Sequence, residues 1–299
     1  MQDRRSFLAT LGAAALGAAG FACARPAQQD PTQRDATQGG ASPRGATSGS
    51  LGPIGVQLYT VRNEMQKDVA ATLARVARIG YKEVEFAGYF GRQPTEIRSL
   101  LTANGLTAPS AHIGLDMLQD TWARTLDAAK SIGHEYLIVA YLPEERRRTL
   151  DDYKRIAEQF NRAGQDAQKA GIKFGYHNHD FEFTKLEGGS IGYDTLLAST
   201  DPALVAFEMD LYWITKAGYD PLAYFAKYPG RFQLVHVKDS AGPPAHEMRP
   251  VGQGTIDWKR IFAQRAQAGI RHYFVEHDNP TDAFASIETS YGYLSKLAV

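Results

Sequence analysis

Several features that would point to common protein functions are scarce in this sequence. The 299 residues include one cysteine, which excludes an internal disulfide and a cysteine-based metal cluster. Lysine plus arginine balance aspartate plus glutamate at 33 each, with no basic run, so nucleic acid is not an expected partner. After the N-terminal segment, no apolar run is long enough to cross a bilayer. What is left is an ordinary globular composition with a hydrophobic fraction of 43%.

The N-terminus has the layout of an export signal. Arg4 and Arg5 stand before Ser6, and a small-residue apolar stretch follows over residues 8–22. This pattern is typical of a twin-arginine signal over residues 1–23. It predicts a protein that crosses the membrane folded and is periplasmic or anchored in the cell envelope. A short amphipathic or buried helix is the alternative.

The processing point has two interpretations. Cys23 stands where the acylated cysteine of a lipoprotein would be, although Gly20 replaces the usual leucine three residues before it. Ala22 and Ala24 also form a small-x-small cleavage site, which would remove Cys23. Residues 24–52 are rich in Gln, Ser, Gly, Thr and Pro and predict a disordered linker. Such a tether favours a lipid anchor through Cys23.

From residue 53 to residue 299, apolar β-branched runs alternate with helical patterns. Six of these segments close on a glycine before the next run: Gly80, Gly105, Gly133, Gly171, Gly230 and Gly269. Helical stretches begin with aspartates that suit the N-cap position: Asp116, Asp151, Asp220 and Asp257. Eight strand-helix repeats in about 250 residues predict a single (β/α)8 TIM barrel. A doubly wound open sheet is the alternative, but "LYTVRNEM" after the first run lacks its glycine-rich loop.

The ends of the expected strands carry side chains suited to metal binding and proton transfer. They are Gln57, Tyr59, Glu85, His112, His177, His179, Asp210, His236, Lys238 and Glu276. Barrel chemistry occurs at these C-terminal ends, and alternation puts His177 and His179 on one face. Four consecutive strands each supply a nitrogen or oxygen donor, which predicts a divalent metal site. Any one of these residues alone would be interpreted as a hydrogen-bonded loop or core residue. We expect His134, His246 and His272 at surface or loop positions.

Five motifs in order support a family resemblance: "YHNHDFEF", "FEMDLYW", "LVHVKD", "VGQGTIDW" and "YFVEHD". Over residues 54–297 the chain resembles the xylose-isomerase-like barrels grouped as sugar phosphate isomerases/epimerases, which include inosose dehydratase. The resemblance implies one divalent metal (manganese, cobalt, zinc or magnesium) held by strands five to eight. By position, it implies Asp210, His236 and Glu276 as ligands.

Two positions depart from the epimerases of that family. The epimerases have a glutamate on strand five, where this chain has His177, with His179 as the alternative ligand. A two-base epimerase needs a carboxylate on each side of the substrate carbon, so the change favours elimination, which needs one base and one acid. They also have a histidine three residues after the metal aspartate, where this chain has Trp213. An indole there suits the apolar face of a sugar.

These observations lead to the hypothesis of a metal-dependent sugar lyase that acts on a keto-sugar, a keto-glycoside or an inosose. An epimerase or isomerase of the same family is the alternative. Glu276, His179 or Lys238 would remove the proton beside the carbonyl, and His112 or Glu182 would protonate the departing oxygen. The expected sugar contacts are Gln57, Tyr59, Glu85, Trp213, Tyr212 and Lys238.

Two functions from other classes are also considered. A metal-dependent endonuclease would need a larger cluster of ligands and a basic groove, and neither is evident. A tethered, non-catalytic sugar-binding protein would have no need of a stoichiometric metal ion. The expected partner is a small-molecule carbohydrate, and a homodimer is compatible with the sequence.

Overall fold

The computed structural model describes residues 51–299. The expected signal over residues 1–23, with Cys23, and the expected linker up to residue 50 lie outside the described residues, so those predictions stay predictions. The expected barrel domain over residues 53–299 is described throughout. Within the described residues, no helix combines the length and the apolar character that a bilayer span requires.

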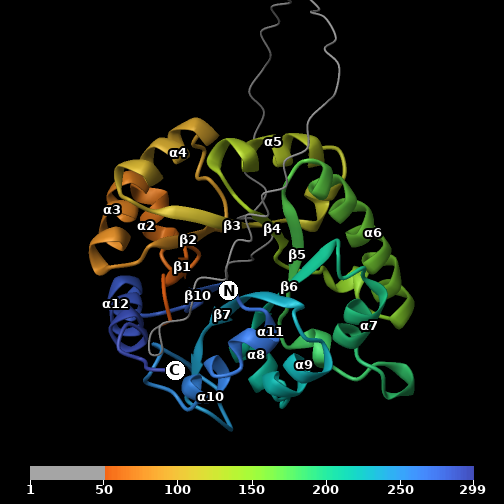
Figure 1. The fold of residues 1–299 in the computed structure, drawn as a ribbon. Helices are drawn as coiled ribbons and strands as arrows, with labels where there is room; N and C mark the ends of the chain where they lie inside the picture. Colours follow the sequence, from red (N-terminus) through yellow and green to blue (C-terminus); the bar gives the residue numbers. More distant parts are fainter. Residues whose placement is uncertain (1–50) are drawn as a thin grey trace, which may run out of the picture.

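Eight parallel strands form a closed barrel at the centre of the domain (Figure 1). In chain order they are β1 (Gly55–Gln57), β2 (Glu83–Phe86), β3 (Thr107–Ile113), β4 (Tyr136–Val139), β5 (Lys173–His177), β6 (Val205–Asp210), β7 (Phe232–Val237) and β10 (His272–Val275). The order around the barrel follows the chain, and β10 pairs with β1 to close it. The predicted TIM barrel is confirmed, and the open sheet is wrong because the strands close on themselves.

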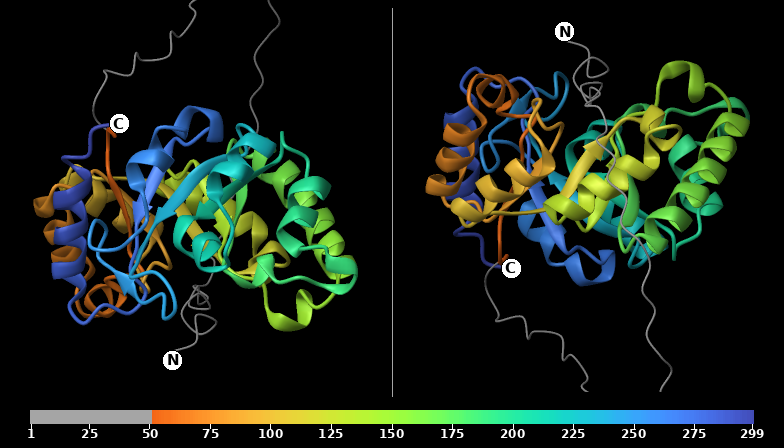
Figure 2. Two further views of the ribbon diagram at one scale, coloured as in Figure 1. Left: turned by 90° about the horizontal axis from the view of Figure 1, so that it is seen from below. Right: turned by 90° about the horizontal axis from the view of Figure 1, so that it is seen from above.

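Helices form an outer ring around the strands in the views along and across the barrel (Figures 1 and 2). They are α2 (Arg62–Lys67), α3 (Val69–Ile79), α4 (Pro94–Ala103), α5 (Trp122–Ile132), α6 (Leu150–Lys169), α7 (Gly192–Ser199), α8 (Leu211–Lys216), α9 (Pro221–Lys227), α10 (Trp258–Phe262), α11 (Arg265–Ala268) and α12 (Ala283–Leu294). Short 3₁₀ helices lie in the connections: η1 (Leu115–Leu118), η2 (Glu144–Arg146), η3 (Phe181–Phe183) and η4 (Glu187–Gly189).

Helix α6 illustrates how the sequence forms this outer ring. Thr149 and Asp152 make a capping box, in which each side chain accepts a hydrogen bond from the backbone N–H of the other. Ile156 and Phe160 lie on one helical face and are buried. The expected cap, Asp151, is therefore wrong by two residues, because the threonine hydroxyl takes the N-cap position.

The other expected helix boundaries have mixed outcomes. Asp220 and Asp257 are N-caps of α9 and α10, as predicted. Asp116 is not a cap, because it lies inside η1, whose N-cap is Gly114. All six glycines expected to end helices have a positive φ, between 62° and 125°, which strains other residues.

An apolar layer fills part of the barrel interior. Its buried side chains are Tyr136, Ile138, Ala206, Leu234 and Phe274. Gly175 makes room for them, since an added Cβ would lie 2.6 Å from Ile138 Cδ1 and 3.0 Å from the Ala206 carbonyl oxygen. Close packing of this kind excludes water from the underside of the polar centre described below.

The segment after β7 was not expected from the strand-helix pattern. It includes an antiparallel hairpin of β8 (Asp239–Ser240) and β9 (Met248–Arg249). The buried Asp239 carboxylate accepts hydrogen bonds from the backbone of Gly252 at 2.9 Å, the backbone of Gly254 at 3.2 Å and the indole of Trp258 at 3.0 Å. A Cβ on Gly254 would lie 2.1 Å from Asp239 Oδ1, so this close approach requires glycine.

Two histidines differ from the expectation of surface or loop positions. His134 is buried, with Nδ1 donating to the Ala108 carbonyl oxygen at 2.6 Å, and burial lowers the pKa of His134 to about 4. His272 is the first residue of β10, with its Nδ1 2.8 Å from Glu83 Oε2 at the N-terminal end of the barrel. His246 lies in a loop, as expected.

Candidate metal centre

Strand register determines which polar side chains meet inside the barrel. His177, the last residue of β5, pairs with Glu208 of β6, and Asp210, the last residue of β6, pairs with His236 of β7. Alternation along β6 puts Glu208 and Asp210 on the same face. All four residues are fully buried, so they converge in the interior at the C-terminal end of the strands.

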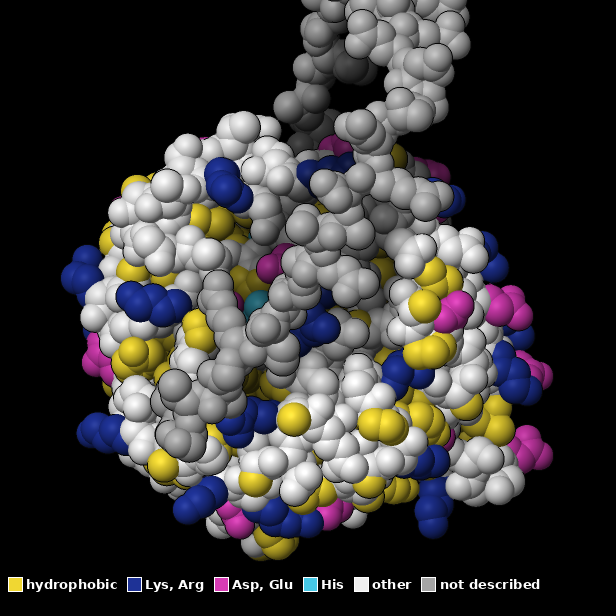
Figure 3. Space-filling view, in the orientation of Figure 1, with side chains coloured by type: hydrophobic (Ala, Val, Ile, Leu, Met, Phe, Trp, Pro, Cys, Tyr) yellow, Lys and Arg dark blue, Asp and Glu magenta, His cyan; other side chains and the backbone are white. Residues whose placement is uncertain are grey.

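Four side chains at this end form the mouth cluster: Asp210, Lys238, Glu276 and Asp278. Lys238 Nζ lies 2.9 Å from Asp210 Oδ2, 2.7 Å from Glu276 Oε2 and 3.0 Å from Asp278 Oδ1. A single ammonium group therefore holds three carboxylates together. In the space-filling view down the barrel, histidine, acidic and basic side chains are visible in the central hollow (Figure 3).

Three side chains within β2, β3 and β6 form the core cluster: Glu85, His112 and Glu208. His112 Nε2 lies 2.6 Å from Glu208 Oε2 and 3.2 Å from Glu85 Oε2. His236 links the two clusters, because its Nε2 is 2.6 Å from Glu85 Oε2 and its Nδ1 is 2.7 Å from Glu276 Oε2. The rings of His112 and His236 are stacked with centroids 5.1 Å apart.

His177 lies between the two clusters. Its Nδ1 is 3.0 Å from Glu208 Oε2, and its Nε2 is 3.7 Å from Asp210 Oδ2. Among the described residues, this buried Nε2 has no hydrogen-bond partner. His179 belongs to neither group of convergent ligand atoms within residues 51–299. The geometry thus favours His177 over His179 as the candidate ligand on strand five.

Burial and charge have opposing effects on ionisation in this centre. Burial alone would lower the pKa of His236, but the surrounding carboxylates, Glu208 first, raise it well above its usual value. Burial alone would raise the pKa of Glu208, but the imidazoles of His236 and His112 hold it well below its usual range. Burial and the charge on His236 lower the pKa of His177 well below its usual value. His177 is therefore neutral and keeps a nitrogen lone pair.

The residues present fit a divalent cation. Two groups of ligand atoms lie close enough together to share an ion: Asp210, His236 and Glu276, and also His112, His177, Glu208 and His236. The carboxyl groups of the two clusters belong to Glu85, Glu208, Asp210, Glu276 and Asp278, and all five residues are buried. Lys238 lies within ion-pair distance of three of them, Asp210, Glu276 and Asp278, and buried carboxylates without a counter-charge are costly. A divalent cation would offset two of these charges, and the unpartnered His177 Nε2 is a further donor for it.

His179 and Glu182 lie in the turn after β5. The His179 ring centroid is 5.1 Å from that of His177 and 5.6 Å from that of Trp213, so His179 stands beside the metal-ligand candidates. The Glu182 carboxylate is buried and accepts hydrogen bonds from the Tyr176 hydroxyl and, at 2.8 Å, from the His179 backbone N–H. Burial raises the pKa of Glu182 to about 8. Its two oxygens therefore hold the turn that carries His179.

The expected sugar-binding residues separate into two sets. Trp213 is partly exposed, and Lys238 Nζ lies 5.6 Å from its ring centroid. Tyr212 packs against Trp213 with centroids 4.9 Å apart. Gln57 and Glu85, by contrast, are fully buried, and Gln57 donates to Glu85 at 2.7 Å. Trp213 is thus the most accessible of these expected sugar contacts, while Gln57 and Glu85 lie in or beside the core cluster.

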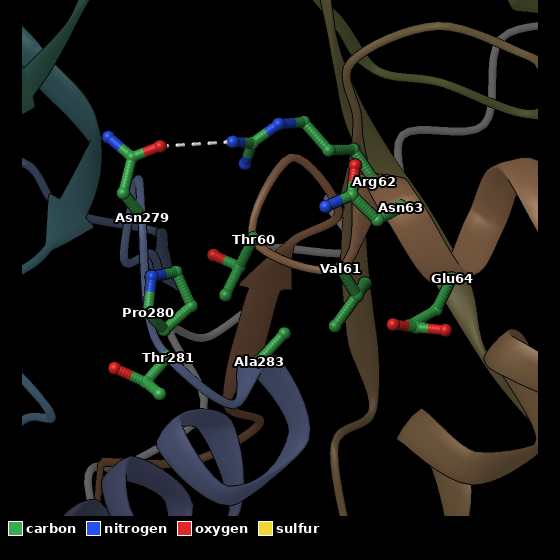
Figure 4. A pocket seen from close by; sticks show the side chains of 9 residues that line it. All are labelled: Thr60, Val61, Arg62, Asn63, Glu64, Asn279, Pro280, Thr281 and Ala283. Carbon is green, nitrogen blue, oxygen red and sulfur yellow. Dashed lines mark hydrogen bonds between the residues drawn. The ribbon is translucent and has the colours of Figure 1, made fainter. Parts of the chain in front are cut away.

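A polar pocket of about 200 Å³ lies between the loops that follow β1 and β10 (Figure 4). It is lined by Thr60, Val61, Arg62, Asn63, Glu64, Asn279, Pro280, Thr281 and Ala283. Arg62 donates to the Asp278 carbonyl oxygen at 2.8 Å and to Asn279 Oδ1 at 3.1 Å, and it covers the Tyr59 ring at 4.0 Å. The pocket is joined to the mouth cluster through Asp278, but no side chain of that cluster lines it.

The barrel fold agrees with a comparison to known families. A family model for the xylose isomerase-like TIM barrel matches residues 73–295. The chain belongs to this family. Assignment to the xylose isomerase-like TIM barrels confirms the resemblance that the five sequence motifs indicated.

Several known proteins are similar to this chain over different lengths. An inosose dehydratase from Geobacillus kaustophilus (strain HTA426) is 29% identical over 192 residues, which are 56% of this chain and 60% of that protein. The matched part thus spans less than two thirds of that relative. A sugar phosphate isomerase/epimerase structure from Parabacteroides distasonis ATCC 8503 has a TM-score of 0.72 and 28% identity, covering 84% of this chain and 96% of that one. The IolI protein, solved with a zinc atom, shares the fold at 13% identity and a TM-score of 0.64, covering 82% and 99% of the two chains.

Two residues of this xylose isomerase-like centre were missed by sequence reasoning. Glu208 contacts His112 and His177, and Asp278 contacts Lys238 at 3.0 Å. Glu208 stands two residues before Asp210, and Asp278 stands two residues after Glu276. The alternation that placed His177 and His179 on one face was therefore also a signal for Glu208, provided that the whole strand was considered and not only its end.

Proposed function

We propose that this chain is a divalent-metal-dependent sugar lyase that acts on a keto-sugar, a keto-glycoside or an inosose. The observation that carries the proposal is the convergence of donor atoms from Asp210, His236 and Glu276, with His177 Nε2 3.7 Å from Asp210 Oδ2. These residues come from the ends of four consecutive barrel strands. Similarity to proteins named inosose dehydratase supports a lyase.

His177, Asp210, His236 and Glu276 would hold the metal, which supplies a Lewis acid to polarise the substrate carbonyl when it is bound. The set contains two imidazoles and two carboxylates. Two imidazoles beside two carboxylates suit zinc or cobalt and also accept manganese, whereas magnesium prefers a set of oxygen ligands and keeps several waters. We therefore expect purified protein to retain about one equivalent of one of the first three metals.

The proton-transfer groups stand beside these ligands. His179 lies outside both ligand groups and takes the proton from the carbon next to the carbonyl. The electrons of that C–H bond form the new C=C bond, and the substituent on the β-carbon departs with the electrons of its own bond. We assign the proton for the departing oxygen to Lys238. His112 Nε2 and both Glu182 oxygens are engaged inside the barrel.

Trp213 provides the surface for the sugar ring. Its partly exposed indole lies close to both proposed proton-transfer groups, with His179 at 5.6 Å between ring centroids and Lys238 Nζ at 5.6 Å from the ring centroid. The apolar face of a pyranose or inosose ring stacks well on an indole. This placement brings the carbons of a bound ring within reach of His179.

An epimerase or isomerase is the second candidate, favoured by the similarity to the Parabacteroides structure of that name. NMR in deuterated water distinguishes the two functions. Metal-loaded protein is incubated with 3-keto-sugars, keto-glycosides and inososes. A lyase yields an unsaturated ketone and a released leaving group, whereas an epimerase yields a saturated stereoisomer that carries deuterium at the inverted carbon.

Variants of a ligand test the metal dependence of the same reaction. Asp210→Ala should abolish both the bound metal and turnover. Asp166→Ala is the matched control, because Asp166 lies on the surface of α6, where it forms an ion pair with the exposed Lys169. Full activity of metal-free wild type, or of Asp210→Ala, would contradict the proposed function.

We also propose export through the twin-arginine route to the periplasm or the cell envelope, supported by Arg4, Arg5 and the apolar stretch after them. Replacing both arginines by lysine should keep the protein in the cytoplasm in cell fractionation. Cys23→Ser should release it from membranes if Cys23 carries a lipid. An unchanged distribution would contradict the anchor and favour cleavage after Cys23.

A further inference from the structure

We infer that Glu208 is a positioning residue that turns the imidazoles of His177 and His236 toward the metal. The inference rests on the proposed metal site, but Glu208 itself stands outside the proposed ligand set. It lies on β6, two residues before Asp210, and has no exposed surface.

One oxygen of Glu208 receives three imidazole nitrogens. Oε2 lies 2.6 Å from His112 Nε2, 3.0 Å from His177 Nδ1 and 3.1 Å from His236 Nε2. The contacts with His112 and His177 are hydrogen bonds, and bonds to an ionised carboxylate are the stronger kind. The contact with His236 is an ion-pair distance, because His236 Nε2 makes its hydrogen bond with Glu85 Oε2. The group of His112, His177, Glu208 and His236 is therefore held together by contacts among its own side chains. We assign this group to orientation of the histidines rather than to binding of a second ion.

This arrangement determines which nitrogen of His177 is available to a metal. A neutral imidazole has one N–H and one lone pair. Because Nδ1–H points to Glu208, the lone pair is on Nε2, which lies 3.7 Å from Asp210 Oδ2 and has no hydrogen-bond partner within the described residues. Without Glu208, no hydrogen bond within the described residues would hold the proton on Nδ1.

His236 is oriented in the same way from the other side. Its Nε2 lies between Glu85 Oε2 at 2.6 Å and Glu208 Oε2 at 3.1 Å, so Nδ1 faces the mouth cluster. There, Nδ1 is 2.7 Å from Glu276 Oε2. Ligating histidines commonly donate their second N–H to a carboxylate, which holds the ring and raises its basicity.

Strand register explains why Glu208 can serve both histidines. It is the paired residue of His177 across the β5–β6 ladder, and β7, with His236, is the other neighbour of β6. His112 on β3 anchors the carboxylate from the far wall at 2.6 Å. An imidazole on strand five needs such a carboxylate, whereas a carboxylate ligand at that position has no tautomer to be set.

Metal affinity of the full chain tests the inference without substrate. Metal-depleted wild type, Glu208→Gln and Glu208→Leu are titrated with Zn²⁺ against a competing chelator. We expect zinc binding to weaken about 10- to 100-fold in Glu208→Gln, and more in Glu208→Leu. Glu83→Gln is the matched control, because Glu83 makes the same kind of contact with His272, at 2.8 Å, at the opposite end of the barrel. It should bind zinc like wild type.

The ring nitrogens of the metal-free protein give an independent measurement that does not need Glu208→Leu to fold. ¹⁵N NMR should find His177 as the Nδ1–H tautomer in wild type and as a mixture in Glu208→Gln. Wild-type zinc affinity in Glu208→Gln, or an Nε2–H tautomer of His177 in wild type, would overturn the inference. Weakened zinc binding by Glu208→Gln beside a wild type that turns over no keto-sugar would support the positioning role and contradict the lyase.

Discussion

The mouth cluster and the core cluster share His236, yet their charges are balanced in different ways. In the mouth cluster, one ammonium, that of Lys238, faces three carboxylates. In the core cluster, imidazoles alternate with carboxylates, so that each short contact joins one of each kind. The mouth is therefore deficient in positive charge, and the core is not. A cation would stabilise the first and has no equivalent place in the second.

Exposure distinguishes single residues and not the two clusters as wholes. The Asp278 side chain in the mouth is 13% exposed, whereas the side chains of Lys238 beside it and of Glu208 in the core are 0% exposed. Asp278 therefore stands at the accessible edge of the centre. Charge balance, rather than exposure, divides these similar residues into two groups.

His236→Ala removes the residue that both clusters share, so we expect the largest effect from it. Metal content should fall from about one equivalent per chain to a small fraction of that. Stability should fall by about 3–5 kcal/mol, because buried carboxylates lose their imidazole partner. Elemental analysis and denaturant unfolding measure the two effects. His272→Ala, at the other end of the barrel, is the control and should keep its metal. Full metal content in His236→Ala would contradict the role of His236 as a metal ligand.

The two histidines of strand five should give effects of different kinds. His177→Ala should weaken zinc binding at least 10-fold, because a nitrogen donor beside Asp210 is lost. His179→Ala should bind zinc like wild type and lose turnover by about 10²–10⁴-fold, the usual contribution of a proton-transfer group. Zinc titration and steady-state kinetics on both variants distinguish the two roles. Weakened zinc binding in His179→Ala, with wild-type zinc binding in His177→Ala, would show that His179 is the ligand.

Lys238→Met should have opposite effects on metal binding and activity. The ammonium competes with a metal for Asp210 Oδ2 and Glu276 Oε2, so its removal should tighten zinc binding by about tenfold, or roughly 1.4 kcal/mol. Turnover should nevertheless fall by about 10²-fold or more, because the proton donor is lost. Looser zinc binding in this variant would show that Lys238 organises the carboxylates for the metal instead.

Glu182→Gln should change the pH dependence of stability rather than metal binding. The pKa of Glu182 is raised by burial to about 8, above that of an unfolded glutamate, so the folded state holds a proton that the unfolded state loses. This contribution is complete at low pH and is lost as pH rises through 8. Wild-type stability should fall by about 1 kcal/mol per unit between pH 5 and pH 8. The glutamine variant should show a flatter profile in denaturant unfolding, and parallel profiles would contradict the assignment.

Local patterns were sufficient to predict the barrel. The six glycines that end helices and the apolar runs between them are short-range signals, and each has a backbone cause in the structure. The cap at α6 was misplaced, because Thr149 and Asp151 are both good caps, and the reciprocal bond to Asp152 decides between them. Choices of this kind depend on contacts three residues away, which a residue-by-residue preference does not contain.

The candidate site was predictable at the strand ends and less so behind them. Asp210, His236 and Glu276 do converge as the motifs indicated. Glu208 and the role of Glu182 depend on contacts with other elements: Glu208 meets His112 from β3, and Glu182 meets Tyr176 and the backbone of its own turn. A carboxylate beside a strand end has the same sequence signature whether it faces substrate, histidine or backbone. Only the register and the chain path distinguish these cases.

The hydrogen bonds around Asp239 determine where this family member can accept insertions over evolution. That carboxylate binds the backbone of Gly252 and Gly254 and the indole of Trp258, and it directly follows Lys238. An insertion inside the hairpin loop, between β8 and β9, leaves every one of these anchors in place. Loop grafting there could therefore vary the rim of the barrel in length and composition, while the lysine keeps its position.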